Sequence, residues 1–364
     1  MPSPEIIERF LRGEELPLAV DHIAAELEQL WQALPAERMP TRDYHLNLLV
    51  QMSNPALIDQ TTATLREFAQ IHPCRVLLLV LNLHSEQEEL SASVTALLAQ
   101  KEGGQVARCE QIMLLASGGV SVARAVALAL PLVSAELPVA YWFVQGIPAE
   151  TPLLTRLRNQ MPRLMFDSFM TEDLGITLAR AHTLFESTPQ LGDLNWQRLA
   201  PWRAILEEAL AKPECKHLEK ISFILGGEIL DENHIGQPVL LMSWLAQRLE
   251  WELVETLDYV RGTFRAVWEK DGREIVAEIK NTNTQAQELN ALELTTDFAG
   301  QQTVLTFARV DSGTSSALQI VLAHETCKQD LPALEMHELL RQEFERKTDA
   351  KYYQETLELA TKLI

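Results

Sequence analysis

Residues 74–81 read Cys-Arg-Val-Leu-Leu-Leu-Val-Leu, an almost wholly apolar run that directly follows His72-Pro73. A short apolar run of this kind, partly β-branched, is typical of a central strand that is buried on both faces. Such strands belong to sheets that carry helices on each side. This run therefore restricts the possible folds more than any other feature of the chain.

The segments around this run repeat the same pattern of strand and helix. Apolar spacing predicts an amphipathic N-terminal helix over 20–34 and a helix that starts at Asn54-Pro55 and ends at His72-Pro73. The other expected elements are strands at 44–52, 111–115, 138–144 and 163–166, and helices at 86–98, 119–130 and 173–184. This alternation predicts an α/β N-terminal domain over residues 1–188, with a mostly parallel sheet and helices.

The second half of the chain has a different period. Residues 187–192 are predicted to be a connector, and Phe264, Ala266 and Trp268 then alternate with polar neighbours before a tight turn at 270–272. Further strands are expected at 275–279, 289–294, 304–307 and 318–322, followed by helices at 332–344 and 350–363. This pattern predicts an α+β domain over residues 189–364, with an antiparallel meander and C-terminal helices.

The charge of the chain narrows the classes of partner. Its 51 acidic and 31 basic residues give a formal net charge of −20. We therefore expect no nucleic acid and no anionic membrane as the main partner, because both would repel such a surface. The most apolar stretch, 120–144, is interrupted by Arg124, Pro131, Glu136 and Pro138, so we expect a buried helix and strand there and no membrane span.

The termini and cysteines predict a cytoplasmic location. The N-terminus lacks a basic segment followed by an apolar core, so no secretory signal is expected. The four cysteines, Cys74, Cys109, Cys215 and Cys327, are scattered, which favours reduced thiols over a disulfide framework.

A search for catalytic and cofactor motifs is largely negative. The sequence contains no Walker loop, Gly-x-Gly-x-x-Gly, His-Glu-x-x-His or Gly-x-Ser-x-Gly motif. His and Cys lie close together three times without a matching second pair, so no metal site is expected. Ser117-Gly118-Gly119 before an apolar helix could hold a phosphate, with Arg75 or Arg124, but such glycines more often form a simple turn. We therefore predict no catalytic, cofactor or metal residues.

Residues 193–210 contain two of the seven tryptophans and one arginine in an unusual position. As a helix, this stretch places Arg203 within an apolar stripe, with Trp196 beside it and Trp202 at its margin. A buried guanidinium must contact a carboxylate, a carbonyl or another molecule. Two interpretations stay open: an internal ion pair, or an anchor for a partner. Pro201 favours a helix that starts afresh, and Asp193 and Asn195 are candidate N-caps.

Several short segments occur in the order of a known family. They are His72-Pro73-Cys74-Arg75-Val76, Leu137-Pro138-Val139-Ala140-Tyr141-Trp142, Asp193-Leu194-Asn195-Trp196 with Leu199, Trp202 and Arg203, Trp244-Leu245-Ala246, and Arg248-Leu249. From Tyr44 onward the chain resembles the OpcA-type glucose-6-phosphate dehydrogenase assembly proteins. It departs from them where family members often have Trp-Trp followed closely by Gly, because here Tyr141-Trp142 precedes Gly146 by a wider gap.

The resemblance implies a non-catalytic partner protein without cofactor. Such a protein would bind glucose-6-phosphate dehydrogenase, activate it allosterically by promoting its active oligomer, and support the oxidative pentose phosphate pathway. The candidate interaction or interdomain residues are His72, Arg75, Trp142, Asp193, Asn195, Trp196, Trp202 and Arg203.

Two other interpretations remain, and the second of them leaves the assembly role possible through another surface. The chain could be an α/β enzyme or sensor that binds a sugar phosphate or nucleotide at Ser117-Gly118-Gly119. Alternatively, His72, Arg75, Asp193 and Arg203 could form an internal polar network that joins the two domains. Because Trp196, Leu199 and Leu206 share the face of Arg203, we expect the stretch 193–210 to hold the two domains in register rather than to touch the partner directly.

Overall fold

The chain folds into two compact units, each assembled from separate stretches of sequence. The computed structural model describes residues 2–35, 39, 44–97, 99–100, 106–134, 136–149, 152–157, 163–185, 190–211, 217–227, 231–282, 288–298, 300–311, 316–322, 325–331, 335–346 and 351–364. Unit 1 spans Met1–Asp167, Thr188–Gly192 and Met336–Glu345, and unit 2 spans Ser168–Ser187, Asp193–Glu335 and Arg346–Ile364. The domain boundary expected after residue 188 stays a prediction. Residues 187–189 of the expected connector lie outside the described residues.

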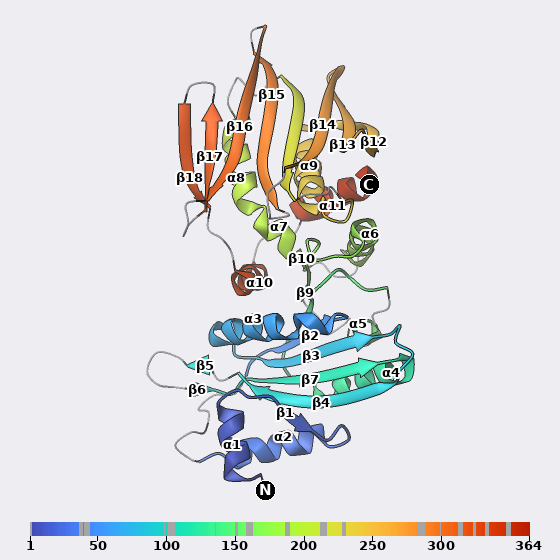
Figure 1. Ribbon diagram of the computed structural model, residues 1–364, viewed down its shortest axis with the longest axis vertical. Helices are drawn as coiled ribbons and strands as arrows, with labels where there is room; N and C mark the ends of the chain where they lie inside the picture. Colours follow the sequence, from blue (N-terminus) through green and yellow to red (C-terminus); the bar gives the residue numbers. More distant parts are fainter. Residues whose placement is uncertain are drawn as a thin grey trace. The chain divides into compact units, whose positions relative to one another are not determined.

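Unit 1 is built on an eight-stranded sheet with the order β1-β4-β7-β3-β2-β8-β9-β10 (Figure 1). Neighbouring strands from β7 to β9 are parallel, whereas β4 and β1 add antiparallel strands at one edge. The strands are β1 Leu16–Leu18, β2 Asn47–Met52, β3 Arg75–Asn82, β4 Glu89–Ala96, β7 Glu110–Ser117, β8 Val139–Phe143, β9 Arg163–Phe166 and β10 Leu191–Asp193, with a separate pair β5 Ala99–Gln100 and β6 Val106–Ala107.

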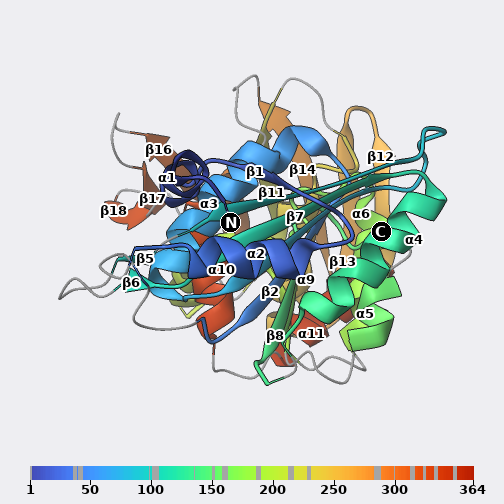
Figure 2. The same cartoon turned by 90° about the horizontal axis from the view of Figure 1, so that it is seen from below.

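The helices of unit 1 begin and end largely where the sequence signals predicted. The Asn54 side chain accepts a hydrogen bond from the Ala56 N–H, and His72 is the C-cap of the following helix. One N-terminal helix, α1, was not expected; it contacts β1 and β4 (Figures 1 and 2). The helices are α1 Pro4–Leu11, α2 Ile23–Gln32, η2 Pro55–Leu57, α3 Ile58–Ile71, α4 Gly119–Ala129, η3 Leu130–Leu132, α5 Pro152–Leu157 and α10 Met336–Glu345.

The strand order has a direct consequence for ligand binding. Counted along the chain, the strands β2, β3, β7, β8, β9 and β10 follow the order 3-2-1-4-5-6 of doubly wound dinucleotide-binding sheets. The crossover through α3 leads from β2 to β3, and the one through α4 leads in the opposite direction across the sheet, from β7 to β8. Right-handed crossovers then place these two helices on opposite faces of the sheet. This explains why Val76 to Val80 on β3 are buried on both sides, as predicted. In such sheets ligands bind where the order reverses, here at the carboxyl ends of β2 and β8.

One predicted element of unit 1 is wrong. Residues 86–98, expected to be a helix, contain strand β4, which pairs antiparallel with β7. Ala92, Val94 and Ala96 alternate with serine and threonine, and Val94 lies opposite Ile112 in the ladder. The neighbouring strand β7 supplies hydrogen-bond partners for the whole segment, so tertiary pairing overrides the local helical spacing.

Unit 2 contains a second eight-stranded sheet, ordered β12-β13-β14-β11-β15-β16-β17-β18. β11 and β14 are parallel and the other neighbours are antiparallel, so β15 to β18 form the predicted meander. Asp271 and Gly272 adopt φ of 52° and 75° at the predicted hairpin turn. The strands are β11 Leu218–Gly226, β12 Glu252–Val260, β13 Thr263–Lys270, β14 Arg273–Thr282, β15 Leu289–Phe298, β16 Gln301–Asp311, β17 Ser316–Leu322 and β18 Glu325–Leu331.

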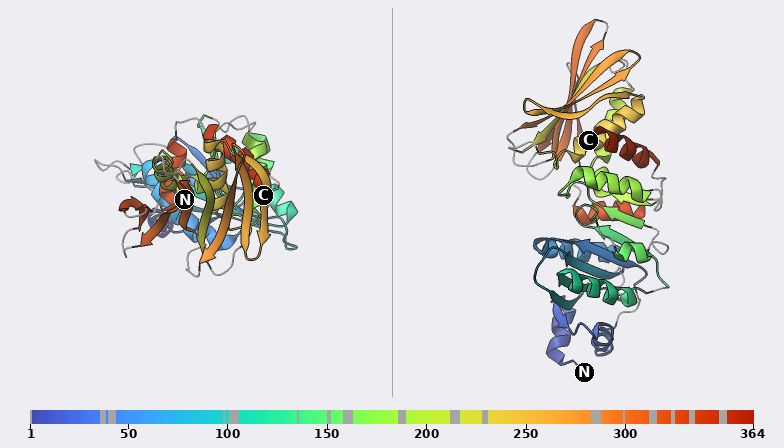
Figure 3. Two further views of the ribbon diagram at one scale, coloured as in Figure 1. Left: turned by 90° about the horizontal axis from the view of Figure 1, so that it is seen from above. Right: turned by 90° about the vertical axis from the view of Figure 1, so that its right-hand side faces the viewer.

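The helices of unit 2 complete its core. α9 and α11 pack against each other on one side of the sheet (Figure 3). Phe223, Trp268 and Phe307 of the sheet are fully buried, and so is the first part of α9. The helices are α6 Leu174–Phe185, α7 Leu194–Arg198, α8 Ala200–Leu210, α9 Gly236–Leu249 and α11 Lys351–Leu363. The predicted fold class is therefore confirmed for both halves of the chain.

The most apolar stretch forms a helix and a strand inside unit 1, as expected. Residues 120–144 contain α4 and β8. Within the described ranges, no helix combines the length and apolar character that a membrane crossing requires. Cys74 and Cys109 are buried and not part of a disulfide, whereas Cys215 and the side chain of Cys327 lie outside the described residues.

Candidate functional site

A buried carboxylate centre forms around Asp193 in unit 2. Asp193 ends β10 and is the N-cap of α7. Its Oδ1 accepts hydrogen bonds from the N–H groups of Ser168 (3.0 Å) and Asn195 (2.9 Å). Its Oδ2 accepts from the hydroxyls of Ser168 (2.7 Å) and Tyr353 (3.1 Å). Asp193 thus ties the turn after β9 and the helix α11 to the start of α7.

Asn195 extends this centre toward helix α9. Its Nδ2 donates to the Ser168 hydroxyl over 3.0 Å, and a Cβ on Gly236 would lie only 3.2 Å from that nitrogen. Among the residues that the structure describes, the buried Asn195 Oδ1 has no hydrogen-bond partner. The centre is therefore packed closely against the first residue of α9, and a Cβ there would require its neighbours to shift by a few tenths of an ångström.

The Trp-rich stretch is two helices, because α7 ends at Leu199 and α8 starts anew with Pro201 in its first turn. This confirms the predicted restart at Pro201. The Arg203 Nη1 donates to the Trp196 main-chain oxygen over 2.6 Å, and the guanidinium carbon lies 3.5 Å from the centroid of the Trp196 ring. Burial lowers the pKa of Arg203 to about 9, although the charge of Glu207 acts in the opposite direction. The sequence predicts a carboxylate, a carbonyl or another molecule as the partner of Arg203, and the structure shows a carbonyl of the chain itself.

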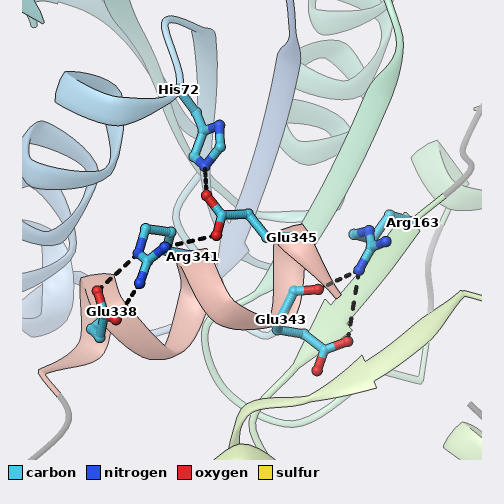
Figure 4. A network of polar contacts seen from close by, with 6 residues as sticks. All are labelled: His72, Arg163, Glu338, Arg341, Glu343 and Glu345. Carbon is cyan, nitrogen blue, oxygen red and sulfur yellow. Dashed lines mark hydrogen bonds and ion pairs between the residues drawn. The ribbon is translucent and has the colours of Figure 1, made fainter. Parts of the chain in front are cut away.

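A second polar cluster holds helix α10 in unit 1 (Figure 4). The His72 Nε2 lies 3.0 Å from the Glu345 Oε1, and the Arg341 Nη1 donates to the other oxygen of that carboxylate over 2.7 Å. Arg163 contacts both the main-chain oxygen and the carboxylate of Glu343. These contacts attach a helix from late in the sequence to β9 and to the end of α3.

His72 itself lies in an aromatic environment. Its ring centroid is 5.0 Å from that of Phe68 on α3 and 4.9 Å from that of Phe344 on α10. Burial lowers the pKa of His72, and this effect outweighs the opposing attraction of the Glu345 carboxylate. The side chain is therefore an element of helix packing in unit 1.

Arg75 and Trp142 lie elsewhere in unit 1. The Arg75 Nε donates to the buried Glu110 carboxylate over 2.8 Å, its Nη1 donates to the Leu132 carbonyl over 3.2 Å, and the guanidinium lies over the Tyr44 ring. Trp142 lies on β8 and is 1% exposed. A direct contact of the Trp142 indole with a partner protein would therefore require unit 1 to open.

The structure thus brings only part of the predicted set together. Asp193 and Asn195 share one centre. The Trp196 ring packs at a tilt against Tyr353 of that centre, with the ring centroids 5.5 Å apart, and also supports Arg203. Trp202 lies on α8, close to these residues in sequence, and is buried. His72, Arg75 and Trp142 belong to unit 1, where each of them has other neighbours. Sequence reasoning missed Ser168 and Tyr353, which lie 25 and 160 residues from Asp193 and carry no local signal of that contact.

The glycine turn considered for phosphate is filled by the chain itself. The Glu88 carboxylate accepts from the N–H groups of Val120 (3.2 Å) and Ser121 (2.7 Å) at the start of α4. These hydrogen bonds hold the pKa of Glu88 below its usual value, and the bond from Ser121 has the larger effect. Arg124, the proposed phosphate partner, forms an ion pair with Asp21 at 2.6 Å. An internal carboxylate therefore caps the helix where an anion was considered.

The point where the strand order reverses is also occupied. The Gln145 Oε1, just beyond β8, accepts hydrogen bonds from the Ser53 N–H (3.1 Å), the Ser53 hydroxyl (3.0 Å) and the Asn54 N–H (3.3 Å). Pro55, the next residue, has no N–H to donate. In dinucleotide-binding sheets the pyrophosphate contacts the amides of this first strand-to-helix turn. Here side chains of the chain itself use those donors.

Among the described residues, no three His, Cys, Asp or Glu side chains are grouped so that they could hold a metal ion. The polar centres found in both units are held by hydrogen bonds and ion pairs within the chain.

The chain matches the models of two domain families. Residues 66–183 match the glucose-6-phosphate dehydrogenase subunit N-terminal domain, and residues 189–357 match the corresponding C-terminal domain. The first match contains His72, Arg75 and Trp142, and the second contains Asp193, Asn195, Trp196, Trp202 and Arg203.

Similar curated proteins are cyanobacterial. The OxPP cycle protein OpcA of Nostoc punctiforme is 26% identical over 222 residues, which cover 58% of this chain and 46% of that protein. The OpcA protein of Synechococcus elongatus is 27% identical over 188 residues, which cover 50% of this chain and 41% of that protein. The matched region thus spans less than half the length of each of these relatives.

The solved structures that match this chain are distant in sequence. A 3-ketoreductase from Actinomadura kijaniata, crystallised with NADP and TDP-benzene, has a TM-score of 0.49 and 10% identity, and the match covers 87% of this chain and 95% of that chain. A Gfo/Idh/MocA family oxidoreductase from Vibrio cholerae has a TM-score of 0.42 and 12% identity, with 87% and 95% covered. Because both TM-scores lie below 0.5, we infer neither cofactor nor activity from them.

Proposed function

Because this chain belongs to the family of OpcA-type glucose-6-phosphate dehydrogenase assembly proteins, we propose that it binds this dehydrogenase as a non-catalytic factor and promotes its active oligomer. In this role it supports the oxidative pentose phosphate pathway from the cytoplasm. The observation that carries the proposal is the pair of consecutive domain matches, over 66–183 and 189–357.

The occupied switch point supports a non-catalytic role. Gln145 takes the amides beside β2, and Glu88 takes the amides at the start of α4. A phosphate group would have to displace a hydrogen-bonded side chain at either place. The sheet therefore keeps the strand order of a nucleotide-binding domain while its own side chains use the donors that a nucleotide needs.

An assembly factor acts through a difference in affinity. It shifts the dehydrogenase toward the oligomer only if it binds that state more tightly than the smaller species. A tenfold difference in affinity corresponds to about 1.4 kcal/mol of coupling free energy. The net charge of −20 favours a partner surface with basic side chains and predicts an association rate that falls as salt is added.

The proposal is tested by mixing the purified chain with the glucose-6-phosphate dehydrogenase of its own organism. Size-exclusion chromatography with light scattering should show a complex of higher mass than either protein, and specific activity should rise across that peak. The dehydrogenase with an equal amount of serum albumin is the control. Two unchanged species without any gain in activity would refute the proposal.

A second candidate is a nucleotide- or sugar-phosphate-binding enzyme or sensor. The 3-2-1-4-5-6 strand order favours it, because this order places a ligand crevice at the ends of β2 and β8. The contacts of Gln145 and Glu88 argue against it. Thermal-shift measurements with NADP and sugar phosphates separate the two candidates, because saturable stabilisation by one of these ligands is expected only for the second.

A further inference from the structure

Arg203 carries a positive charge that the chain does not neutralise. Within the described part of the chain, its only polar contact is the Nη1 hydrogen bond to the Trp196 carbonyl, and no carboxylate lies within ion-pair distance. Partly buried arginines usually face a carboxylate, because desolvating an unpaired guanidinium is unfavourable. This position is therefore an exception that internal packing alone does not account for.

The acidic side chain whose charge acts on Arg203, Glu207, already has another partner. Glu207 lies one turn further along α8, and its Oε1 is 3.3 Å from the Arg248 Nη2 of helix α9. Both partners of that ion pair are half exposed. Glu207 thus acts on Arg203 only through its charge, and the guanidinium keeps its Nε and Nη2 donors for another group.

The guanidinium is also held in one orientation. It lies 3.5 Å from the Trp196 ring centroid, and that ring in turn packs 5.5 Å from Tyr353. The hydrogen bond to the Trp196 carbonyl, 2.6 Å long, prevents the planar group from rotating on the indole. A stacked, fixed guanidinium offers its remaining donors as a flat fork, which matches a carboxylate or phosphate oxygen pair. Little side-chain freedom would be lost when an anion binds.

We propose that Arg203, stacked on Trp196, receives an acidic side chain of the docking partner. This inference rests on the proposed function, in which the partner is the dehydrogenase. Most of the chain's charge is negative and attracts a basic surface in general, whereas the single, partly buried cation at Arg203 would fix the orientation in which that surface docks. The contact would therefore contribute to specificity as well as to affinity.

The test compares Arg203→Met and Arg203→Lys with the wild-type chain. Calorimetric titration with the dehydrogenase should show about a 10-fold or larger loss of affinity for Arg203→Met, as expected for a charge-assisted contact at an interface. Arg203→Lys keeps the charge without the fork and should show an intermediate loss. Arg124→Met removes the same charge from an exposed ion pair and serves as the matched control.

A stability measurement excludes a purely structural role. Because no buried acid loses its partner, Arg203→Met should unfold at the same urea concentration as the wild type, or at a higher one. A clearly lower midpoint for both Arg203 variants would show that the arginine serves folding and would overturn the inference. Unchanged affinity of folded Arg203→Met for the dehydrogenase would overturn it as well.

A second arm is independent of the dehydrogenase. The chain alone is titrated with glutarate and with inorganic phosphate, and its melting temperature is followed. Saturable stabilisation by glutarate that Arg203→Met abolishes supports a site for a carboxylate. The same result with phosphate alone would mean that Arg203 binds a phosphate group and not an acidic side chain, and would overturn the inference. If neither anion acts, the site is refuted. If the wild type fails to bind the dehydrogenase yet responds to glutarate, the proposed function fails and the anion site stands.

Discussion

Burial and charge compete at His72, which lies between two phenylalanine rings and beside Glu345. The carboxylate favours the protonated imidazole, but desolvation is the larger effect, so the pKa of His72 falls below its usual 6.5 in the folded chain. At Asp193 the buried carboxylate is instead satisfied, because it accepts hydrogen bonds from donors in three different segments.

The lowered pKa of His72 predicts a pH dependence of stability. The unfolded chain binds a proton more readily at this position, so the free energy of unfolding is highest above pH 6.5 and falls as the pH drops below it. Each pKa unit between the two states is worth about 1.4 kcal/mol. Urea unfolding between pH 7.5 and 5.0 should therefore show a flatter profile for His72→Gln than for the wild type. Parallel profiles would contradict this assignment.

At the scale of elements, helix α10 follows the strands of unit 2 in sequence but belongs to unit 1. Phe344 meets Phe68 of α3 edge to face at 5.6 Å, and Arg163 of β9 holds the main chain and carboxylate of Glu343. Gly192 of β10 completes this arrangement, because a Cβ there would lie 2.0 Å from the Glu343 Oε1.

Gly192→Ala is therefore expected to displace Glu343 and weaken the docking of α10. We expect a loss of about 1–3 kcal/mol in the free energy of unfolding, as is usual when a methyl group is forced into a packed site. Limited proteolysis should also cleave the chain around α10 faster in this variant than in the wild type. Gly119→Ala is the matched control: no atom lies within 4 Å of its Cβ, and it should be neutral or stabilising by up to ~1 kcal/mol. Equal stability of the two variants would contradict the packing argument.

At the scale of the whole molecule, the sheet of unit 1 has the strand order of a nucleotide-binding domain, but its phosphate-binding amides are already hydrogen-bonded to side chains of the chain. Gln145 accepts from the amides that a phosphate would need in the turn after β2, and Glu88 accepts from those at the start of α4, which follows β7. The fold alone therefore does not determine the function, which depends on the side chains placed at the switch point.

We accordingly expect no saturable thermal stabilisation of the isolated chain by NADP, NADPH or glucose 6-phosphate. Differential scanning fluorimetry at ligand concentrations up to the millimolar range measures this, with the dehydrogenase itself as positive control. A concentration-dependent rise in melting temperature with a defined plateau would contradict the closed switch point and would favour the enzyme or sensor.

The sequence alone predicted much of this protein. The apolar run at 74–81, the Asn54-Pro55 cap and the turn at 270–272 each act through local rules, and all three appear in the structure. Ordered short segments were enough to identify the family, and Pro201 was enough to predict a helix restart.

Other features were decided only by the tertiary structure. Residues 86–98 form a strand because β7 offers a pairing edge, and local spacing carries no information about that edge. Ser168 and Tyr353 at Asp193, and the donors that bind Gln145, come from segments 25 to 160 residues away. Hydrophobic period and caps are short-range properties, whereas the satisfaction of a buried polar group depends on which distant segments the fold brings next to it.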